Sequence, residues 1–282
     1  MKKLVTLYFL TATLTLFAQK DFQGEATYMS KTTMDMSRFG DRMSEQQKKQ
    51  MMSRMKNFLE KTYTLSFNKS ESSFKENVSL DAPGGGASSR WGASNGQGSI
   101  YKNTQERKMI EDKEQFSKRF LIMEDMDQPK WELGTETKKI GQYTCYKATM
   151  TKVDTSVDWG SMFRRGRRNN DKKKDSTKTK AKPEEKKERI LSITAWYTPQ
   201  IPVSAGPDTY WGLPGLILEL NAGRTTMLCT EITINPDDAI EIKKPKKGKK
   251  VNREEYNQIV KVKTQEIREQ FMNRRRGGGR GF

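Results

Sequence analysis

The sequence contains no histidine, only two cysteines and relatively few hydrophobic residues, which make up 33% of its 282 positions. Without histidine, the chain has no Ser-His or Cys-His nucleophile pair, no histidine-ligated zinc ion and no imidazole acid or base. After residue 18, no apolar run is long enough to cross a bilayer as a helix. The length allows one domain or two small ones.

The positive charge lies mainly in two tracts. The chain has 53 Lys and Arg residues against 35 Asp and Glu residues, and its net charge is +18. Residues 160–189 contribute +8 and residues 243–282 contribute +10, so the rest of the chain is close to neutral. We therefore expect a β-rich domain over residues 19–242, interrupted by a basic disordered insert at 160–188, and a basic helical and disordered tail over 243–282.

Residues 1–18 have the layout of a cleavable export signal. Lys2 and Lys3 precede an apolar run of 14 residues, and Ala18 stands before Gln19. The run is shorter than the roughly 20 residues that a membrane-spanning helix needs, so we expect it to be removed rather than retained as an anchor. No cysteine lies near the cleavage point, so lipidation is not expected there. The predicted location is periplasmic or secreted.

Hydrophobic and polar residues alternate along several segments, as they do in strands with one buried face. Alternation, rather than continuous apolar runs, favours an antiparallel sheet with one solvated face. We expect a mainly β fold, with a single curved antiparallel sheet, open like a half-barrel, and one or two flanking helices. The expected strands are Phe22–Tyr28, Tyr63–Phe67, Glu71–Leu80, Ser99–Asn103, Phe116–Glu124, Gln142–Thr151, Arg189–Tyr197, Leu216–Asn221 and Thr225–Ile234.

Two helices are predicted from their N-terminal caps. Ser44 followed by Gln47 forms a capping box, and an apolar stripe that includes Met51, Met52 and Met55 then predicts a helix ending near residue 61, with these methionines facing the core. Asn252 and Glu255 repeat the cap signature before a partial apolar stripe. Residues 81–98 are rich in Gly and Ser, and residues 273–282 resemble a polar tail, so neither is expected to form an element.

A proline-rich connection separates the last two predicted hairpin strands from the strand before them. Three prolines between residues 199 and 207 favour an extended backbone. Pro214 and Gly215 match the two central positions of a type II turn, which predicts a positive φ at Gly215. Residues 221–223 then fit a hairpin loop.

The same region carries a family resemblance. Residues 212–217 read GLPGLI, with AWYTP and IPVSAGP upstream, and the chain closely resembles the GLPGLI family of exported Bacteroidota proteins. The likeness covers most of residues 20–235 and implies export and a single β-rich domain. Because that family has no established biochemical activity, the resemblance supplies no catalytic residues. A weaker likeness to half-barrels that carry lipids or lipoproteins makes an apolar ligand or an outer-membrane protein a candidate partner.

Four aromatic residues flank the proline-rich connection, namely Trp196, Tyr197, Tyr210 and Trp211. Such a cluster either packs the connection onto the sheet or lines a binding groove. Packing is the better-supported interpretation. The groove remains the alternative.

Methionines crowd the N-terminal part of the mature chain. Thioethers are soft ligands that suit Cu(I), so the cluster is a candidate soft-metal site, although a helix also uses methionine to fill its core-facing side. No histidine or nearby cysteine supports a metal site. The seven residues are Met29, Met34, Met36, Met43, Met51, Met52 and Met55.

Motifs for enzymatic chemistry are weak. Residues 92–96 match G-x-S-x-G, but that nucleophile motif needs a strand, a helix and a histidine partner around it. Three S-x-x-K matches occur in a lysine-rich chain, where chance explains them. An enzyme without histidine is therefore the third interpretation, after a non-enzymatic binding or structural protein of the cell envelope and a soft-metal-binding protein. No cofactor is expected.

The two cysteines test the strand order. An oxidising compartment favours a disulfide between Cys145 and Cys229. If the four strands from residue 142 to 234 form a sequential meander, however, these cysteines lie three strand spacings apart, about 14 Å, and a disulfide needs Cα atoms within about 7 Å. The meander therefore predicts two unpaired thiols.

For the basic tracts, export argues against nucleic acid as a partner and favours weak contact with anionic lipid.

Overall fold

The computed structural model describes residues 22–33, 44–77, 98–153 and 190–277. The predicted signal at 1–18, the G-x-S-x-G match, the basic insert and three of the seven methionines lie outside these residues, and so does nearly all of the Gly/Ser-rich loop. The remaining predictions can be compared with the structure directly.

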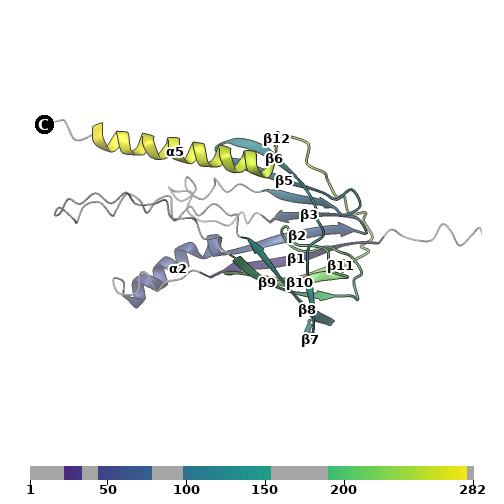
Figure 1. Ribbon diagram of the computed structural model, residues 1–282. Coiled ribbons are helices and arrows are strands. Elements are labelled where there is room, and N and C mark those ends of the chain that lie inside the picture. The colour runs from purple at the N-terminus through teal and green to yellow at the C-terminus, as the bar shows by residue number, and fades with distance from the viewer. Residues whose placement is uncertain (1–21, 34–43, 78–97, 154–189, 278–282) are drawn as a thin grey trace, which may run out of the picture.

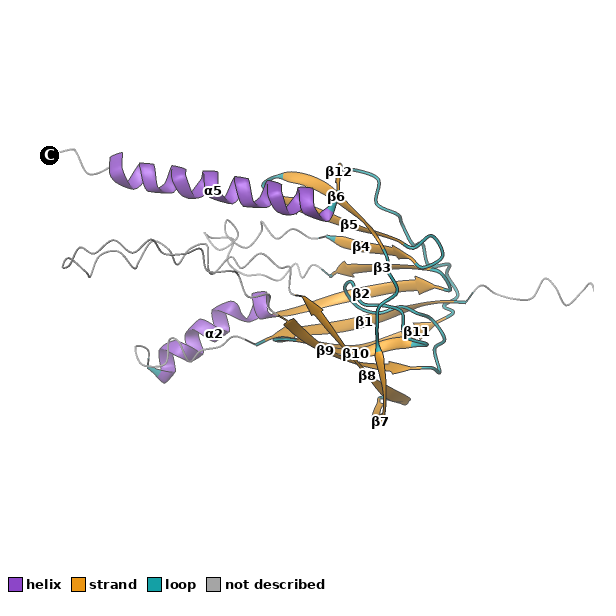
Figure 2. Ribbon diagram, viewed as in Figure 1, coloured by secondary structure: helices purple, strands orange, loops and turns teal. Residues whose placement is uncertain are grey.

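Twelve strands form one open sheet in the order β12-β6-β5-β4-β3-β2-β1-β11-β10-β9-β8-β7 (Figure 1). All neighbours are antiparallel except β12 and β6, which are parallel. The mainly β fold with two helices is therefore confirmed (Figure 2). The strands are β1 Gln23–Thr32, β2 Glu60–Asn68, β3 Glu71–Glu76, β4 Ser99–Asn103, β5 Lys108–Gln115, β6 Lys118–Asp125, β7 Glu132–Ile140, β8 Tyr143–Val153, β9 Ile190–Thr198, β10 Leu216–Ala222, β11 Thr225–Ile234 and β12 Lys249–Val251.

The predicted meander from β8 to β11 is confirmed, since each strand pairs with the next along the chain. Cys145 on β8 and Cys229 on β11 are accordingly free thiols with two strands between them. Both are buried, and burial raises the pKa of Cys145 to about 11 and that of Cys229 to about 12. At neutral pH both groups are therefore protonated and poorly nucleophilic.

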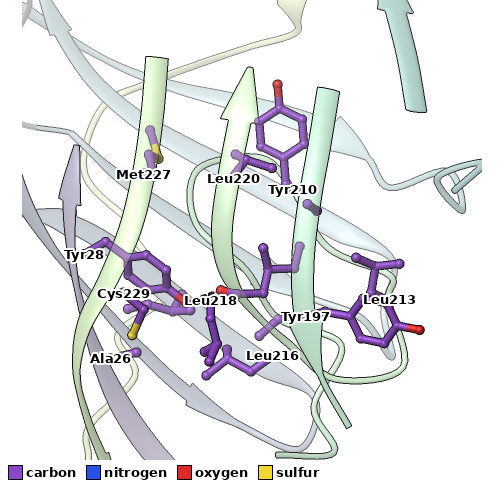
Figure 3. Close-up of a cluster of buried hydrophobic side chains, with 14 of the residues drawn as sticks. Ala26, Tyr28, Tyr197, Tyr210, Leu213, Leu216, Leu218, Leu220, Met227 and Cys229 are labelled. Atoms are coloured by element: carbon purple, nitrogen blue, oxygen red, sulfur yellow. Dashed lines mark hydrogen bonds between the residues drawn. The ribbon is translucent and has the colours of Figure 1, made fainter. Parts of the chain in front are cut away.

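The main core lies on one face of the sheet, which we call the covered face. It is the face that carries Ala26, Tyr28 and Leu65, all fully buried. Over it runs the connection from β9 to β10, residues 199–215, which adds Ile201 and Leu213 to the same cluster (Figure 3). We call this connection the cover segment. Its packing explains why every second residue of β1 from Gly24 to Ser30 is buried while the residues between are not.

The first helix, α2 Glu45–Leu59, begins as predicted. Ser44 and Gln47 form both hydrogen bonds of the capping box. The prediction that its methionines face the core is wrong: Met52 is 39% exposed, and Met51 and Met55 are only half-buried. Figure 1 shows the reason, because α2 projects beyond the ends of β1 and β2 instead of lying across the sheet.

The second helix, α5 Arg253–Gly277, packs on the covered face near the β6 edge. Asn252 and Glu255 form the predicted cap, with each backbone N–H donating to the other side chain at 3.2 and 2.8 Å. Tyr256 and Val260 pack against Phe120 and its neighbours. The helix continues to residue 277, so the expected unstructured tail from 273 is wrong for its first five residues. None of the described helices has an apolar stretch that could cross a membrane.

The predicted type II turn at Pro214 and Gly215 is also wrong. Gly212 has a positive φ of 90°, whereas Gly215 is not among the residues with positive φ. Gly215 is required for a different reason: a Cβ atom there would lie 2.2 Å from the carbonyl oxygen of Thr198. The glycine therefore permits close contact between two backbones.

We predict that Gly215→Ala lowers the free energy of unfolding by about 2–3 kcal/mol, because the backbone of Thr198 would have to move. Gly141→Ala is the matched control. Gly141 has a φ of 58° but nothing within 4 Å of its Cβ position, so only backbone strain of about 1 kcal/mol is expected. Urea denaturation measures both. Equal effects would contradict the close-contact explanation.

Candidate functional site

The cover segment is held by its own backbone hydrogen bonds and by the sheet. The amide of Val203 donates to the carbonyl of Ile201 at 2.8 Å, and the amide of Ile217 donates to Ala205 at 3.2 Å. From β1, the hydroxyl of Tyr28 donates to the carbonyl of Ile217 at 2.6 Å. The first two bonds satisfy part of the irregular backbone that the segment carries into the core, and the third satisfies a carbonyl of β10 directly after the segment.

At the centre of the segment, a lysine from the sheet supplies the remaining donors. Lys102 on β4 is 1% exposed, and its ammonium group lies within hydrogen-bonding distance of three backbone carbonyls. The distances from Nζ are 2.7 Å to Gly206, 2.7 Å to Asp208 and 3.0 Å to Tyr210. A lysine ammonium has three N–H donors and no acceptor, so the three carbonyls match its full capacity. We call this arrangement the lysine anchor.

The backbone of the segment bends so that alternate carbonyls converge on Lys102. Asp208 adopts a positive φ of 53°, which is uncommon for a residue other than glycine. The amide of Tyr210 donates to the carbonyl of Pro207 at 3.2 Å and closes a tight turn around it. This left-handed residue directs the carbonyls of residues 206, 208 and 210 to one point.

The anchor places two ionisable groups in a buried environment. Burial lowers the pKa of Lys102 to about 7, and the nearby carboxylate of Asp208 partly opposes this shift. Burial also raises the pKa of Asp208, while Lys102 acts in the opposite direction. Strongly perturbed groups of this kind occur both at active sites and in structural ion pairs. The contacts of Lys102 favour a structural role, because its three N–H donors are bonded to main-chain carbonyls of its own chain.

A shallow pocket opens beside the anchor, between the β2–β3 turn and the cover segment. Lys102 contributes to its wall but keeps only 1% of its surface exposed, so the pocket gives a ligand little access to it. Eight of the ten lining residues are polar or charged. It consists of Asn68, Lys69, Ser70, Glu71, Ser72, Lys102, Thr104, Ser204, Ala205 and Trp211.

The four aromatic residues proposed for a groove do not form one surface. Tyr197, Tyr210 and Trp211 are 6%, 9% and 8% exposed and belong to the packing of the cover segment. Trp196 is half-buried and points to the opposite face, where the ammonium of Lys138 lies 4.3 Å from its ring centre. The arrangement favours the packing interpretation of these residues.

The described methionines are dispersed. Met29 on β1 is 52% exposed and alternates with the buried Tyr28, so it lies on the face opposite the core. Met52 is exposed on α2. In the part of the chain that the structure describes, no group of three His, Cys, Asp or Glu side chains could hold a metal ion. The soft-metal hypothesis stays a prediction, because Met34, Met36 and Met43 lie outside the described residues.

Comparison with known proteins finds a family match over part of the chain and no activity. The family model Porph_ging, described as a protein of unknown function, matches residues 131–219, which run from the end of the β6–β7 connection through the cover segment into β10. This GLPGLI-type match confirms the resemblance in the sequence for that part of the chain. No curated protein matches the chain significantly.

Among solved structures, the chain is similar to two crystal forms of PNGF-II. The first, in space group P21, shares 13% identity at a TM-score of 0.47, with 84% of this chain and 33% of that chain covered. The second, in space group C2, shares 12% identity at the same TM-score, with 85% and 32% covered. The chain therefore spans about a third of the length of these structures.

Sequence reasoning missed the lysine anchor. The sequence places Lys102 in the predicted strand Ser99–Asn103 but indicates no role for it, because a lysine in a strand is usually exposed. One signal was available: Ile100 and Lys102 are two residues apart and therefore share a face of the strand. A lysine on the same strand face as an apolar residue can be recognised as buried only when its hydrogen-bond acceptors are known. Those acceptors lie 104 to 108 residues later in the sequence.

We predict that Lys102→Met lowers the free energy of unfolding by about 2–4 kcal/mol at pH 7, because three buried carbonyls lose their donor. Lys75→Met on the neighbouring β3 is the matched control. Lys75 is exposed, so its replacement should change stability by less than about 0.5 kcal/mol. Urea denaturation measures both variants.

Wild type and the Lys102→Met variant together test the titration of Lys102. The folded-state pKa of about 7 lies below the unfolded value of 10.5, so the unfolded chain binds more protons between these limits. Stability from this group therefore rises with pH from about 7 toward 10.5, by at most about 1.4 kcal/mol per pH unit. The stability difference between wild type and Lys102→Met should widen from pH 7 to 9. A difference that is independent of pH would contradict a buried, titrating lysine.

Proposed function

We propose that the chain is an exported, non-enzymatic binding or structural protein of the cell envelope, located in the periplasm or secreted. The single observation that carries the non-enzymatic part is the lysine anchor. Lys102 is the described side chain that most resembles a catalytic amine, since burial lowers its pKa to about 7. Its ammonium group is bonded to three carbonyls of the cover segment and is therefore engaged in holding the fold.

The other potential nucleophiles support the same proposal. Cys145 and Cys229 are buried thiols with raised pKa values, which disfavours the reactive thiolate. A catalytic cysteine requires the opposite shift, produced by a positive charge or a helix N-terminus beside it. These buried thiols thus contribute to packing rather than to a site that a substrate could enter.

Export is supported by the sequence of residues 1–18, with its basic start, its apolar run and Ala18 before Gln19. Free thiols are compatible with an oxidising compartment when they are buried and separated by two strands, as Cys145 and Cys229 are. The likeness to the GLPGLI-type family over residues 131–219 agrees with this proposal and adds no activity to it.

One mass-spectrometry experiment on protein recovered from the cell envelope tests both parts. We predict an intact mass that begins at Gln19, with or without its cyclisation. A mature protein that still carries Met1 would contradict export.

The same sample is then treated with formaldehyde and cyanoborohydride, which methylate accessible lysines. Lys102 should react at least about tenfold more slowly than the exposed Lys75, because it becomes accessible only when the structure opens. The two should become equal in urea. Rapid methylation of Lys102 in the folded protein would instead favour an enzyme with an accessible amine nucleophile.

A further inference from the structure

The chain after β11 crosses from the middle of the sheet to its edge and carries an unusual density of positive charge. Residues 243–250 contain six lysines in eight positions. The segment runs over the face opposite the cover segment, where Ile242 packs against Tyr101, Ile110 and Leu121. It then enters the sheet as β12, beside β6. The position of these lysines is therefore fixed by the fold.

Two of the six lysines are used within the molecule. Lys243 pairs with Glu241 at 2.8 Å, and Lys244 pairs with Glu106 at 3.3 Å. Lys244 also lies 5.7 Å from the ring centre of Tyr101. These contacts attach the segment to the sheet.

The other four lysines point to solvent. Lys246, Lys247, Lys249 and Lys250 are exposed, and within the described residues none of them has an ion-pair partner within 4 Å. Lys249 is paired with Phe120 in the parallel register, and Lys118 precedes Phe120 by two residues on β6. Lys118 is exposed as well. We call these five residues the edge lysine patch.

Arginine and acidic residues around the patch do not neutralise it. Arg119, between Lys118 and Phe120, is held by Asp112. Arg253, at the start of α5, pairs with Glu111 and Glu124 on the covered face at 2.7 and 2.6 Å. Asp112, Glu111 and Glu124 are thus paired with arginines, and none of these three carboxylates forms an ion pair with an edge lysine.

Protection of an exposed strand edge does not account for so many charges. A lysine on an edge strand discourages pairing with other chains, and a very short edge strand has the same effect. β12 is only three residues long and already meets that need. Four exposed lysines within five positions, next to a fifth on the adjacent strand, are more than edge protection requires.

We propose that the edge lysine patch is a docking surface for the anionic surface of a lipid bilayer. The argument rests on charge complementarity and on the proposed export, which separates the protein from nucleic acid. The patch also contains no aromatic side chain on which a base could stack, as single-stranded nucleic-acid sites usually do. Lysines near an anionic membrane each strengthen binding by about fivefold, and the effect decays within about 8 Å at physiological salt.

The experiment measures sedimentation of the full chain with vesicles of phosphatidylcholine that contain about 30% phosphatidylglycerol as the anionic lipid. The test variant replaces Lys246, Lys247, Lys249 and Lys250 with glutamine. A matched control replaces four exposed lysines elsewhere in the described structure, and so removes the same net charge. They are Lys49, Lys69, Lys130 and Lys139.

We expect the patch variant to bind at least roughly tenfold more weakly than wild type, and the control to lose less than about threefold. Wild-type binding should also fall as salt is raised from about 0.1 to about 0.5 M, because the Debye length shortens from about 10 Å to about 4–5 Å. Melting temperatures of both variants should match wild type, which separates lost binding from lost folding.

Three results would overturn the proposal. The first is equal loss in the patch and control variants, which would show that net charge alone controls binding. The second is binding to vesicles of phosphatidylcholine only. The third is a patch variant that loses affinity for duplex DNA but keeps its affinity for anionic vesicles, which would assign the patch to a nucleic acid. Vesicle binding by purified protein does not depend on export, so failure here leaves the proposed function to its own test.

Discussion

The structure depends on one lysine that is buried between a sheet and the irregular segment above it. Irregular backbone in a core carries carbonyl groups that no strand or helix satisfies, and each unsatisfied carbonyl costs about 1–3 kcal/mol. Lys102 satisfies three of them with one side chain. The consequence is that residues 199–215 can cover the central strands although they form no regular element of their own.

The same face of the sheet is covered a second time by α5, through a different interaction. Tyr256 and Val260 bury the β6 end of the face, while Arg253 pairs with two carboxylates from β5 and β6. The chain reaches this position by passing over the opposite face and around the β12 edge. The cover segment and the C-terminal helix therefore divide the covered face between them, and the lysine-rich turn between the two faces is exposed at the edge.

The sequence predicts the local parts of this fold well. Ser99–Asn103 is found at its predicted bounds, although Tyr101, Lys102 and Asn103 are all buried and the strand is covered on both faces. Thr225–Ile234 is also found at its predicted bounds, because its alternation reflects one buried face. Both helix caps are correct for the same reason, since a cap involves residues only three positions apart. β5 was not predicted, because its sequence is mostly charged. Several of its charged residues are paired by other elements, including Arg253 at the start of α5, which pairs with Glu111.

Contacts that join distant residues were the ones that sequence reasoning missed. The turn chemistry of Pro214 and Gly215 suggested a positive φ, but the glycine is explained by the backbone of Thr198. The methionine stripe of α2 predicts a core contact, but the helix projects beyond the ends of β1 and β2, and its methionines are half-buried or exposed. Lys102 is the clearest case, because nothing in the sequence around it indicates that its partners are the carbonyls of residues 206, 208 and 210.

The central claim is that Lys102 fixes the cover segment on the sheet. Native-state hydrogen exchange of wild type and Lys102→Met tests it most directly. It is read at the amide of Val203 within the segment, at the amide of Ile217 on β10, which donates to Ala205 of the segment, and at Leu65 in the sheet beneath. The account predicts that the first two exchange faster in the variant by a larger factor than Leu65 does, because the segment opens locally before the sheet unfolds. An equal acceleration at all three amides, or none at Val203 and Ile217, would contradict it.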